Sequence, residues 1–211
     1  MVYELEDDRV PFASQYVSIF ILLINIIVFI IQLFDPTGYL FIYEAAFVPN
    51  EFFSGRKTWT IFTSMFMHGS FIHIILNLYF FYVVGDNCEH AMGHLYFLIA
   101  YLISGLIGSL LHGIIAIATG FGDIPSLGAS GAIMGIIAIY GILFPRNRLR
   151  YLFFYGTISA RTFILITFIT ELIYGFISLF VLTGTAHFAH IGGLISGVFF
   201  AYVFKMFSKK Y

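Results

Sequence analysis

Charged residues and cysteines are scarce in this chain. Asp, Glu, Lys and Arg make up only 10% of its 211 residues, whereas they make up about a quarter of a soluble domain. Hydrophobic residues account for 60%, so an ordinary soluble globule is excluded. The single cysteine, Cys88, can form no internal disulfide and cannot hold a zinc ion alone. The fold must therefore depend on helices that pack in a lipid bilayer.

The chain also lacks an excess of either charge. Ten Lys and Arg residues balance eleven Asp and Glu residues, which gives a formal net charge of -1. Nucleic-acid binding needs a basic surface, so it is excluded as a function. No sequence repeat relates the two halves, which argues against a transporter built from inverted repeats.

Long apolar runs predict an all-α polytopic membrane protein with six transmembrane helices, since one span needs about 20 apolar residues. With about 15 residues, the fourth run is too short to cross a bilayer of about 30 Å. We expect it to begin inside the membrane, beneath a cavity. The six runs cover residues 15–34, 70–86, 94–118, 130–144, 162–182 and 187–207.

The remaining segments complete the predicted domain organisation. Residues 1–14 are acidic, which is the wrong charge for a cleavable signal peptide, and we interpret them as a cytoplasmic tail. Residues 15–207 form one six-helix domain, and residues 208–211 form a cytoplasmic C-terminal end. Residues 35–67 are too polar to span and too apolar for a solvated linker. They predict a long, ordered first loop at, or partly in, the membrane interface.

The distribution of Lys and Arg predicts the orientation. The long first loop has only Arg56 and Lys57, whereas the opposite side has eight basic residues. The positive-inside rule therefore places both termini in the cytoplasm and the first loop outside. The short extramembrane segments favour a prokaryotic plasma membrane, with an organellar membrane as the alternative. The eight residues are Arg9, Arg146, Arg148, Arg150, Arg161, Lys205, Lys209 and Lys210.

Polar residues at the second span indicate a functional site, because polar groups in hydrocarbon are costly. His73 and Asn77 are four residues apart and share one helix face. His68 lies at the outer end of the same span. The alternative is that each residue only bonds a neighbouring helix, which contributes about 1 kcal/mol.

A glycine-rich motif, GASG, stands at the start of the fourth span and contains Gly128 and Ser130. Small residues alone would indicate close helix packing. A serine in the first turn, however, lies near unpaired backbone N–H groups that could bind a developing oxyanion. The flanking glycines leave space for a substrate backbone. Ser130 is therefore a candidate nucleophile.

The sixth span supplies a candidate base. Gly193 and Gly197 predict a face on which another helix can pack closely. If the fourth helix packs there, an imidazole of the sixth span could accept the Ser130 proton. Spacing does not choose between His187 and His190. Metal binding by the histidines of the second and sixth spans is the competing chemistry, but HExxH is absent and no carboxylate stands at ligand spacing. We therefore expect no metal.

Together these motifs resemble the rhomboid family of intramembrane serine proteases, from the first span to Gly197. Each fragment alone is weak, whereas four in order on six hydrophobic runs are specific. The family patterns are H-x4-H-x3-N at His68, His73 and Asn77; G-x3-E-x3-G at Gly85, Glu89 and Gly93; GASG at Ser130; and A-H-x2-G-x3-G, which selects His190 over His187.

The resemblance implies a Ser130–His190 dyad that opens to a water-filled cavity on the outer side. It implies that His73, Asn77 and the Ser130 N–H bind the oxyanion, while His68 and Gly128 line the cavity. The substrates would be transmembrane segments of other proteins, and no cofactor is implied. By the same resemblance, the residues of the G-x3-E-x3-G motif are structural and brace the turn toward the third span.

Three residues depart from the family pattern or stand apart from it. Thr60 follows Trp59 where the family often has Arg, so the contact of that Arg is either absent or replaced by Arg56 or Lys57. Met134 stands where some members have an aromatic residue. Glu171 lies in the middle of the fifth span, where we expect a protonated or hydrogen-bonded carboxyl. We interpret it as structural or gating rather than catalytic.

Two other functions compete with proteolysis. A catalytically inactive rhomboid-like protein would bind transmembrane helices without cleaving them, but such proteins usually lack the Ser or His that this chain retains. A small channel or transporter would use the buried His and Asn residues as a polar pathway. The missing repeat and the absence of paired membrane charges argue against this second alternative.

Overall fold

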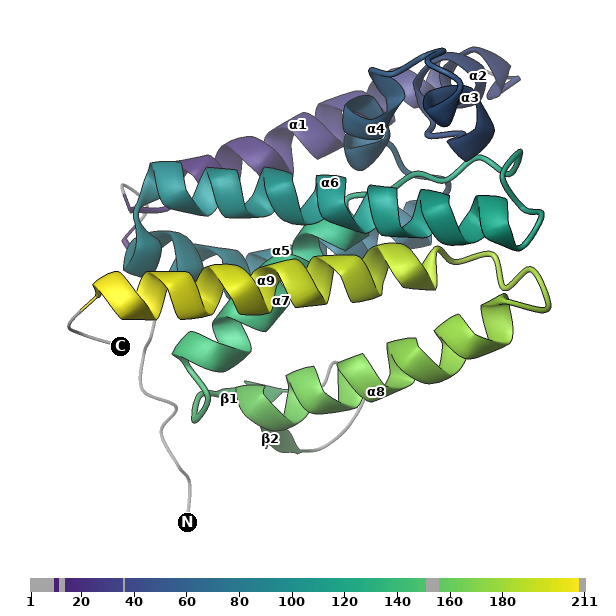
Figure 1. Cartoon of the computed structure of the whole chain (residues 1–211). Helices are drawn as coiled ribbons and strands as arrows, with labels where there is room; N and C mark the ends of the chain where they lie inside the picture. Colours follow the sequence, from purple (N-terminus) through teal and green to yellow (C-terminus); the bar gives the residue numbers. More distant parts are fainter. Residues whose placement is uncertain (1–9, 12–13, 36, 151–155, 209–211) are drawn as a thin grey trace.

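The computed structural model describes residues 10, 11, 14–35, 37–150 and 156–208. Of the expected tails, 1–14 and 208–211, most residues therefore lie outside the described part. Figure 1 shows a bundle of long helices with a group of short helices at one end. The helices long and apolar enough to span a membrane are α1 (Tyr16–Leu33), α5 (Phe71–Met92), α6 (His94–Ala118), α8 (Ala160–Ser178) and α9 (His187–Phe207). The prediction of an all-α polytopic membrane protein is confirmed.

The shorter helix α7 (Ser130–Leu143) lies at the centre of the bundle and contacts α5, α6, α8 and α9. Eleven of its fourteen residues are buried, as expected for a helix that is apolar all round. At about 1.5 Å per residue it is about 21 Å long, which is less than the hydrocarbon thickness of about 30 Å. This length agrees with a helix that begins inside the membrane.

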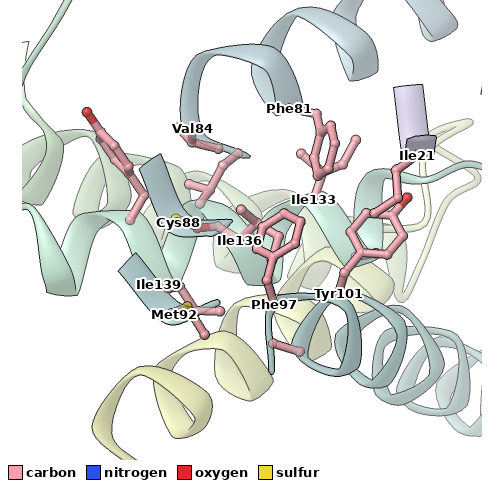
Figure 2. Packing of buried hydrophobic residues seen from close by; sticks show 14 of the residues in the cluster. Ile21, Phe81, Val84, Cys88, Met92, Phe97, Tyr101, Ile133, Ile136 and Ile139 are labelled. Atoms are coloured by element: carbon pink, nitrogen blue, oxygen red, sulfur yellow. The ribbon is translucent and has the colours of Figure 1, made fainter. Parts of the chain in front are cut away.

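The hydrophobic core fixes α7 against α5 and α6. Cys88 on α5 is fully buried, and its Sγ lies 3.8 Å from the carbonyl oxygen of Ile136 on α7. On the α6 side, Tyr101 and Phe97 are also fully buried. Figure 2 shows these side chains converging with others from α1, α5 and α7, among them Ile21, Phe81, Val84, Met92, Ile133 and Ile139.

Close backbone contact joins α7 to α9 at the glycine face that the spacing predicts. A Cβ atom on Gly193 would lie 1.9 Å from the carbonyl oxygen of Gly131, and one on Gly197 would lie 2.1 Å from that of Gly135. No side chain fits at such distances, so glycine is required at both α9 positions. This contact brings the N-terminal turns of α7 and α9 side by side.

The predicted loop at 87–93 is wrong, because α5 continues to Met92 and only Gly93 separates it from α6. Glu89, which lies in this segment, is fully buried. Its carboxylate accepts the N–H groups of Val17 and Ser18 at 2.9 and 2.6 Å, and it pairs with His94. Glu89 therefore caps the start of α1 and also braces the turn into α6.

The first loop is ordered, as predicted, and contains α2 (Tyr39–Ala45), α3 (Pro49–Phe53), α4 (Thr60–Thr63) and the 3-10 helix η2 (Ser64–Phe66). Lys57 connects these short helices. Its Nζ donates to the carbonyl oxygen of Tyr43 at 2.6 Å and lies 3.7 Å from Glu44 and 3.6 Å from Glu51. Lys57 thus supplies a cation in the loop where the family often has an arginine after Trp59. The position of the loop at the membrane interface stays a prediction.

A short hairpin that the sequence did not predict joins α7 to α8. Strands β1 (Arg148–Arg150) and β2 (Thr157–Ser159) pair antiparallel, with Leu149 opposite Ile158. The hairpin ends where the Ser159 hydroxyl caps α8 by accepting the N–H of Thr162. It lies at the opposite end of α7 from Ser130 (Figure 1).

Candidate active site

Ser130 and His190 meet where α7 and α9 begin. The Ser130 Oγ lies 2.7 Å from the His190 Nε2, which is within hydrogen-bond distance. Ser130 is the first residue of α7, and His190 lies in the first turn of α9 with 8% of its surface exposed. The structure places His190, not His187, against the serine. The catalytic roles of both residues stay predictions.

The first loop holds the segment that precedes Ser130. Phe47 and Ser126 form an antiparallel bridge with two backbone hydrogen bonds of 2.9 and 2.8 Å. The N–H of Gly128 donates to the carbonyl oxygen of Ser64 at 2.9 Å. The short helices of the first loop therefore fix the backbone on the N-terminal side of the serine.

Gly128 occupies a position that only glycine fits. Its φ of +129° is a conformation that other residues rarely adopt. A Cβ atom there would lie 2.8 Å from the His73 Nε2 and 3.6 Å from the Ser130 Oγ. Because Gly128 has no side chain, the space between the imidazole of His73 and the hydroxyl of Ser130 stays open. Gly128 therefore lines the site, as expected.

His73 and Asn77 lie on the face of α5 that turns toward α7. Asn77 is buried, and its Nδ2 donates to the carbonyl oxygen of His73 at 3.1 Å. That bond uses one of the two amide hydrogens of Asn77. The structure brings His73 next to Gly128, while the contact of Asn77 is with its own helix. Their role as oxyanion donors stays a prediction.

His68 is buried behind His73, outside the membrane-spanning helices. The two rings meet edge to face, with centroids 5.1 Å apart. Burial, together with the charge of His73, lowers the pKa of His68 to about 4, so this imidazole is neutral at pH 7. Gln32 on α1 clamps its backbone by two hydrogen bonds of 3.0 and 3.2 Å. A glutamine near the end of an apolar run was the one sequence signal for this contact.

Glu171 of α8 reaches both histidines of α9. Its Oε2 accepts a hydrogen bond from the His187 Nδ1 at 2.8 Å, and its Oε1 lies 3.0 Å from the His190 Nδ1. The second contact has the distance of an ion pair, but its angle falls short of a hydrogen bond. The expectation of a hydrogen-bonded carboxyl inside the bundle is confirmed.

No carboxylate stands at ligand spacing from the histidines in the sequence, but the fold brings Glu171 to two of them. The ligand atoms of Glu171, His187 and His190 all lie within 4.8 Å of one another, because α8 packs beside α9. Three such groups could hold a cation. Among the described residues, His68 and His73 belong to no such cluster, so the four-histidine site considered from the sequence does not form.

A cavity of about 370 Å³ lies beside the dyad. It is bounded by α5, α6, α9 and the segment before α7, with His73, His112, Leu127, Ala186 and His187 in its wall. A larger cavity of about 580 Å³ lies between the far ends of α7, α8 and α9. Neither Ser130 nor His190 is in the wall of either cavity, but the wall of the smaller one includes His73, Leu127 and His187, which lie next to the two residues. The smaller cavity is therefore the nearer of the two to the serine.

This fold defines a multi-pass integral membrane protein with a serine and a histidine at its buried centre. The family model for the Rhomboid domain matches residues 55–207. The chain therefore belongs to the rhomboid family, as its motifs indicated.

Named relatives support the same assignment. The chain is 30% identical over 152 residues to the rhomboid protease GluP of Bacillus subtilis, which is 72% of this chain and 27% of that protein. It is 27% identical to RHOMBOID-like protein 6, mitochondrial, of Arabidopsis thaliana over 72% of this chain and 45% of the relative. The presenilin-associated rhomboid-like protein, mitochondrial, of Bos taurus is 35% identical over 43% of this chain and 24% of its own length.

The chain spans less than half the length of these curated relatives. Two of them are mitochondrial by name, so family membership does not select a prokaryotic plasma membrane. That location and the cytoplasmic placement of both termini stay predictions.

Proposed function

We propose that this chain is an intramembrane serine endopeptidase that cleaves transmembrane segments of other membrane proteins with a Ser130–His190 dyad. The observation that carries the proposal is the distance of 2.7 Å between the Ser130 Oγ and the His190 Nε2. A serine hydroxyl is a weak nucleophile unless a base takes its proton. Membership of a family that contains proteases supports the same function.

Acylation begins when Oγ attacks the scissile carbonyl carbon and its proton passes to the His190 Nε2. The new Oγ–C bond gives a tetrahedral intermediate, and its C–N bond then breaks as the leaving nitrogen takes the proton from Nε2. A water molecule attacks the resulting ester and gives its proton to Nε2. Oγ then leaves and regains that proton. The adjacent cavity of about 370 Å³ supplies the water.

The oxyanion has three proposed donors around the serine. The Ser130 N–H belongs to the first turn of α7, where amide groups lack intrahelical acceptors. The Nε2 of His73 lies next to Gly128. Asn77 has a second amide hydrogen besides the one that bonds its own helix, and we propose that this hydrogen binds the oxyanion. Donors of this kind each contribute about 10²- to 10³-fold to kcat.

The narrow site limits the substrate. A transmembrane helix hides its carbonyl groups in internal hydrogen bonds, so the segment must unwind before Ser130 can attack. Weak helix formers such as Gly or Pro favour that unwinding. Because His73 lies so close to Gly128, the site has room only for a small substrate side chain next to the cleaved bond.

Covalent labelling by a fluorescent fluorophosphonate tests this proposal without a known substrate. The purified full chain is compared with Ser130→Ala, His190→Ala and the control Ser126→Ala, which keeps the backbone bridge to Phe47. We expect labelling of the wild type and of the control, and its loss in the other two variants. A folded wild-type protein that is neither labelled nor able to cleave model transmembrane segments would instead indicate a protein that binds helices without cleaving them.

A further inference from the structure

We propose that Glu171 is a positioning residue for the catalytic histidine, so that the active group is Ser130–His190–Glu171 rather than a dyad alone. The inference rests on the proposed function. It starts from one observation: two different helices contact the two nitrogens of one imidazole. The His190 Nε2 lies 2.7 Å from Ser130 on α7, and its Nδ1 lies 3.0 Å from Glu171 on α8.

The Glu171 carboxylate favours the tautomer of His190 that carries its proton on Nδ1. A neutral imidazole carries its proton on one nitrogen and a lone pair on the other. A carboxylate beside Nδ1 repels a lone pair there and attracts an N–H. The proton therefore stays on Nδ1, and the Nε2 lone pair is left to receive the proton of Ser130.

The carboxylate also stabilises the charge that forms during the reaction. When Nε2 takes the serine proton, the ring becomes a cation 3.0 Å from the Glu171 Oε1. The Glu171 side chain is only 12% exposed, so water screens this attraction little. The stabilisation is present only once the proton has moved, which makes it specific to the reacting state.

His187 holds the carboxylate in place. It occupies the second oxygen of Glu171 with a hydrogen bond of 2.8 Å. Tyr174 of α8 stacks on the ring of His187 with centroids 5.5 Å apart. The carboxylate is thereby fixed between two residues of α9 that are one turn apart.

No other anion in the described part of the chain is placed to do this for His190. The titratable groups that face its ring from the surrounding helices are His73 on α5, His112 on α6 and His187 on α9. All three are histidines, which repel an imidazolium when they are charged. Glu171 is thus the group that balances the positive charge of the protonated His190.

The kinetic test uses Glu171→Gln and Glu171→Asp, with Glu89→Gln as the matched control. Glu89 is also a buried carboxylate bonded to a histidine, but it lies in the cap of α1. We expect Glu171→Gln to lower kcat and the fluorophosphonate labelling rate by about 10²- to 10⁴-fold with little change in KM. We expect Glu171→Asp to recover part of the rate. The control should lower the melting temperature and leave the rate per folded molecule within a few-fold of wild type.

A second measurement keeps this inference separate from the proposed function. ¹⁵N NMR of the histidine rings in the wild-type protein at pH 8, assigned with His190→Gln, reports which nitrogen of His190 carries the proton. We expect the Nδ1–H form even if the chain proves to cleave nothing. An Nε2–H form, or labelling of folded Glu171→Gln at the wild-type rate, would overturn the inference. So would activity that EDTA abolishes and Zn²⁺ restores, because Glu171 would then hold a metal ion with His187 and His190.

Discussion

At the scale of single residues, the site depends on side chains whose neighbours come from other helices. Ser130 has an imidazole beside it because α9 places His190 there, and His190 has a carboxyl group beside it because α8 places Glu171 there. His68 differs from these residues, because its burial and the nearby His73 disfavour the protonated, charged form of its imidazole. That penalty makes the stability of the protein depend on pH.

The stability of the folded protein should fall as the pH falls from about 6.5 toward 4. The pKa of His68 is lowered to about 4 in the folded protein, whereas in the unfolded chain it is about 6.5. Between these values the unfolded chain binds a proton that the folded protein does not, so acid favours unfolding. The full shift corresponds to about 3 kcal/mol.

Melting temperatures of the wild type and of His68→Gln, measured from pH 7.5 to 4.5, check this. The variant should lose part of the acid sensitivity, while His90→Gln, at an exposed position of α5, should keep it. Equal pH dependence in the wild type and His68→Gln would show that His68 does not titrate with folding.

At the scale of elements, the contact between α7 and α9 determines the distance between serine and histidine. Gly193→Ala would place a Cβ atom 1.9 Å from the carbonyl oxygen of Gly131, so the two helices must separate. Catalysis is more sensitive to such a shift than folding is, because a misplacement of about 1 Å can cost about 100-fold in rate. We expect labelling to fall by at least that factor.

The labelling rate and the melting temperature of Gly193→Ala are to be compared with those of Gly156→Ala. A Cβ on Gly156 meets no atom within 4 Å, so this control should match the wild type. Unchanged labelling of Gly193→Ala would mean that the helices tolerate the larger side chain without moving the dyad.

Elements defined by local patterns could be predicted from the sequence, whereas contacts between helices could not. The apolar runs located the long helices to within a few residues except at the end of α5, which continues to Met92, and the glycine spacing predicted a face of α9 on which another helix packs. The resemblance predicted a structural Glu89 that braces the turn toward α6, but its partners Val17 and Ser18 lie more than 70 residues away on α1, and no local pattern predicted that contact. Glu171 was noticed as unusual, but the packing of α8 on α9, which gives it two histidines, has no signature in spacing.

At the scale of the whole molecule, the distribution of Lys and Arg predicts the orientation in the membrane. The positive-inside rule places the first loop and the α8–α9 connection outside, and the β1–β2 hairpin inside. Cys88 is fully buried, so the wild-type thiol should react poorly and serve as the background.

Single cysteines introduced at exposed positions test this orientation. In intact cells, a membrane-impermeant maleimide should label Ser54→Cys and Thr185→Cys, and it should label Gly156→Cys only after the membrane is opened. The reverse pattern would place both termini outside.

The sparse burial of α8 affects the whole molecule. Of its nineteen residues only Ala160 and Gly175 are buried, so lipid tails provide much of its surroundings. The backbone amides of α8 should therefore exchange with deuterium sooner than those of α7. If Glu171 acts as we propose, the carboxylate leaves His190 whenever α8 moves away from α9. The acyl chain length and fluidity of the bilayer would then regulate turnover by changing how long α8 stays docked.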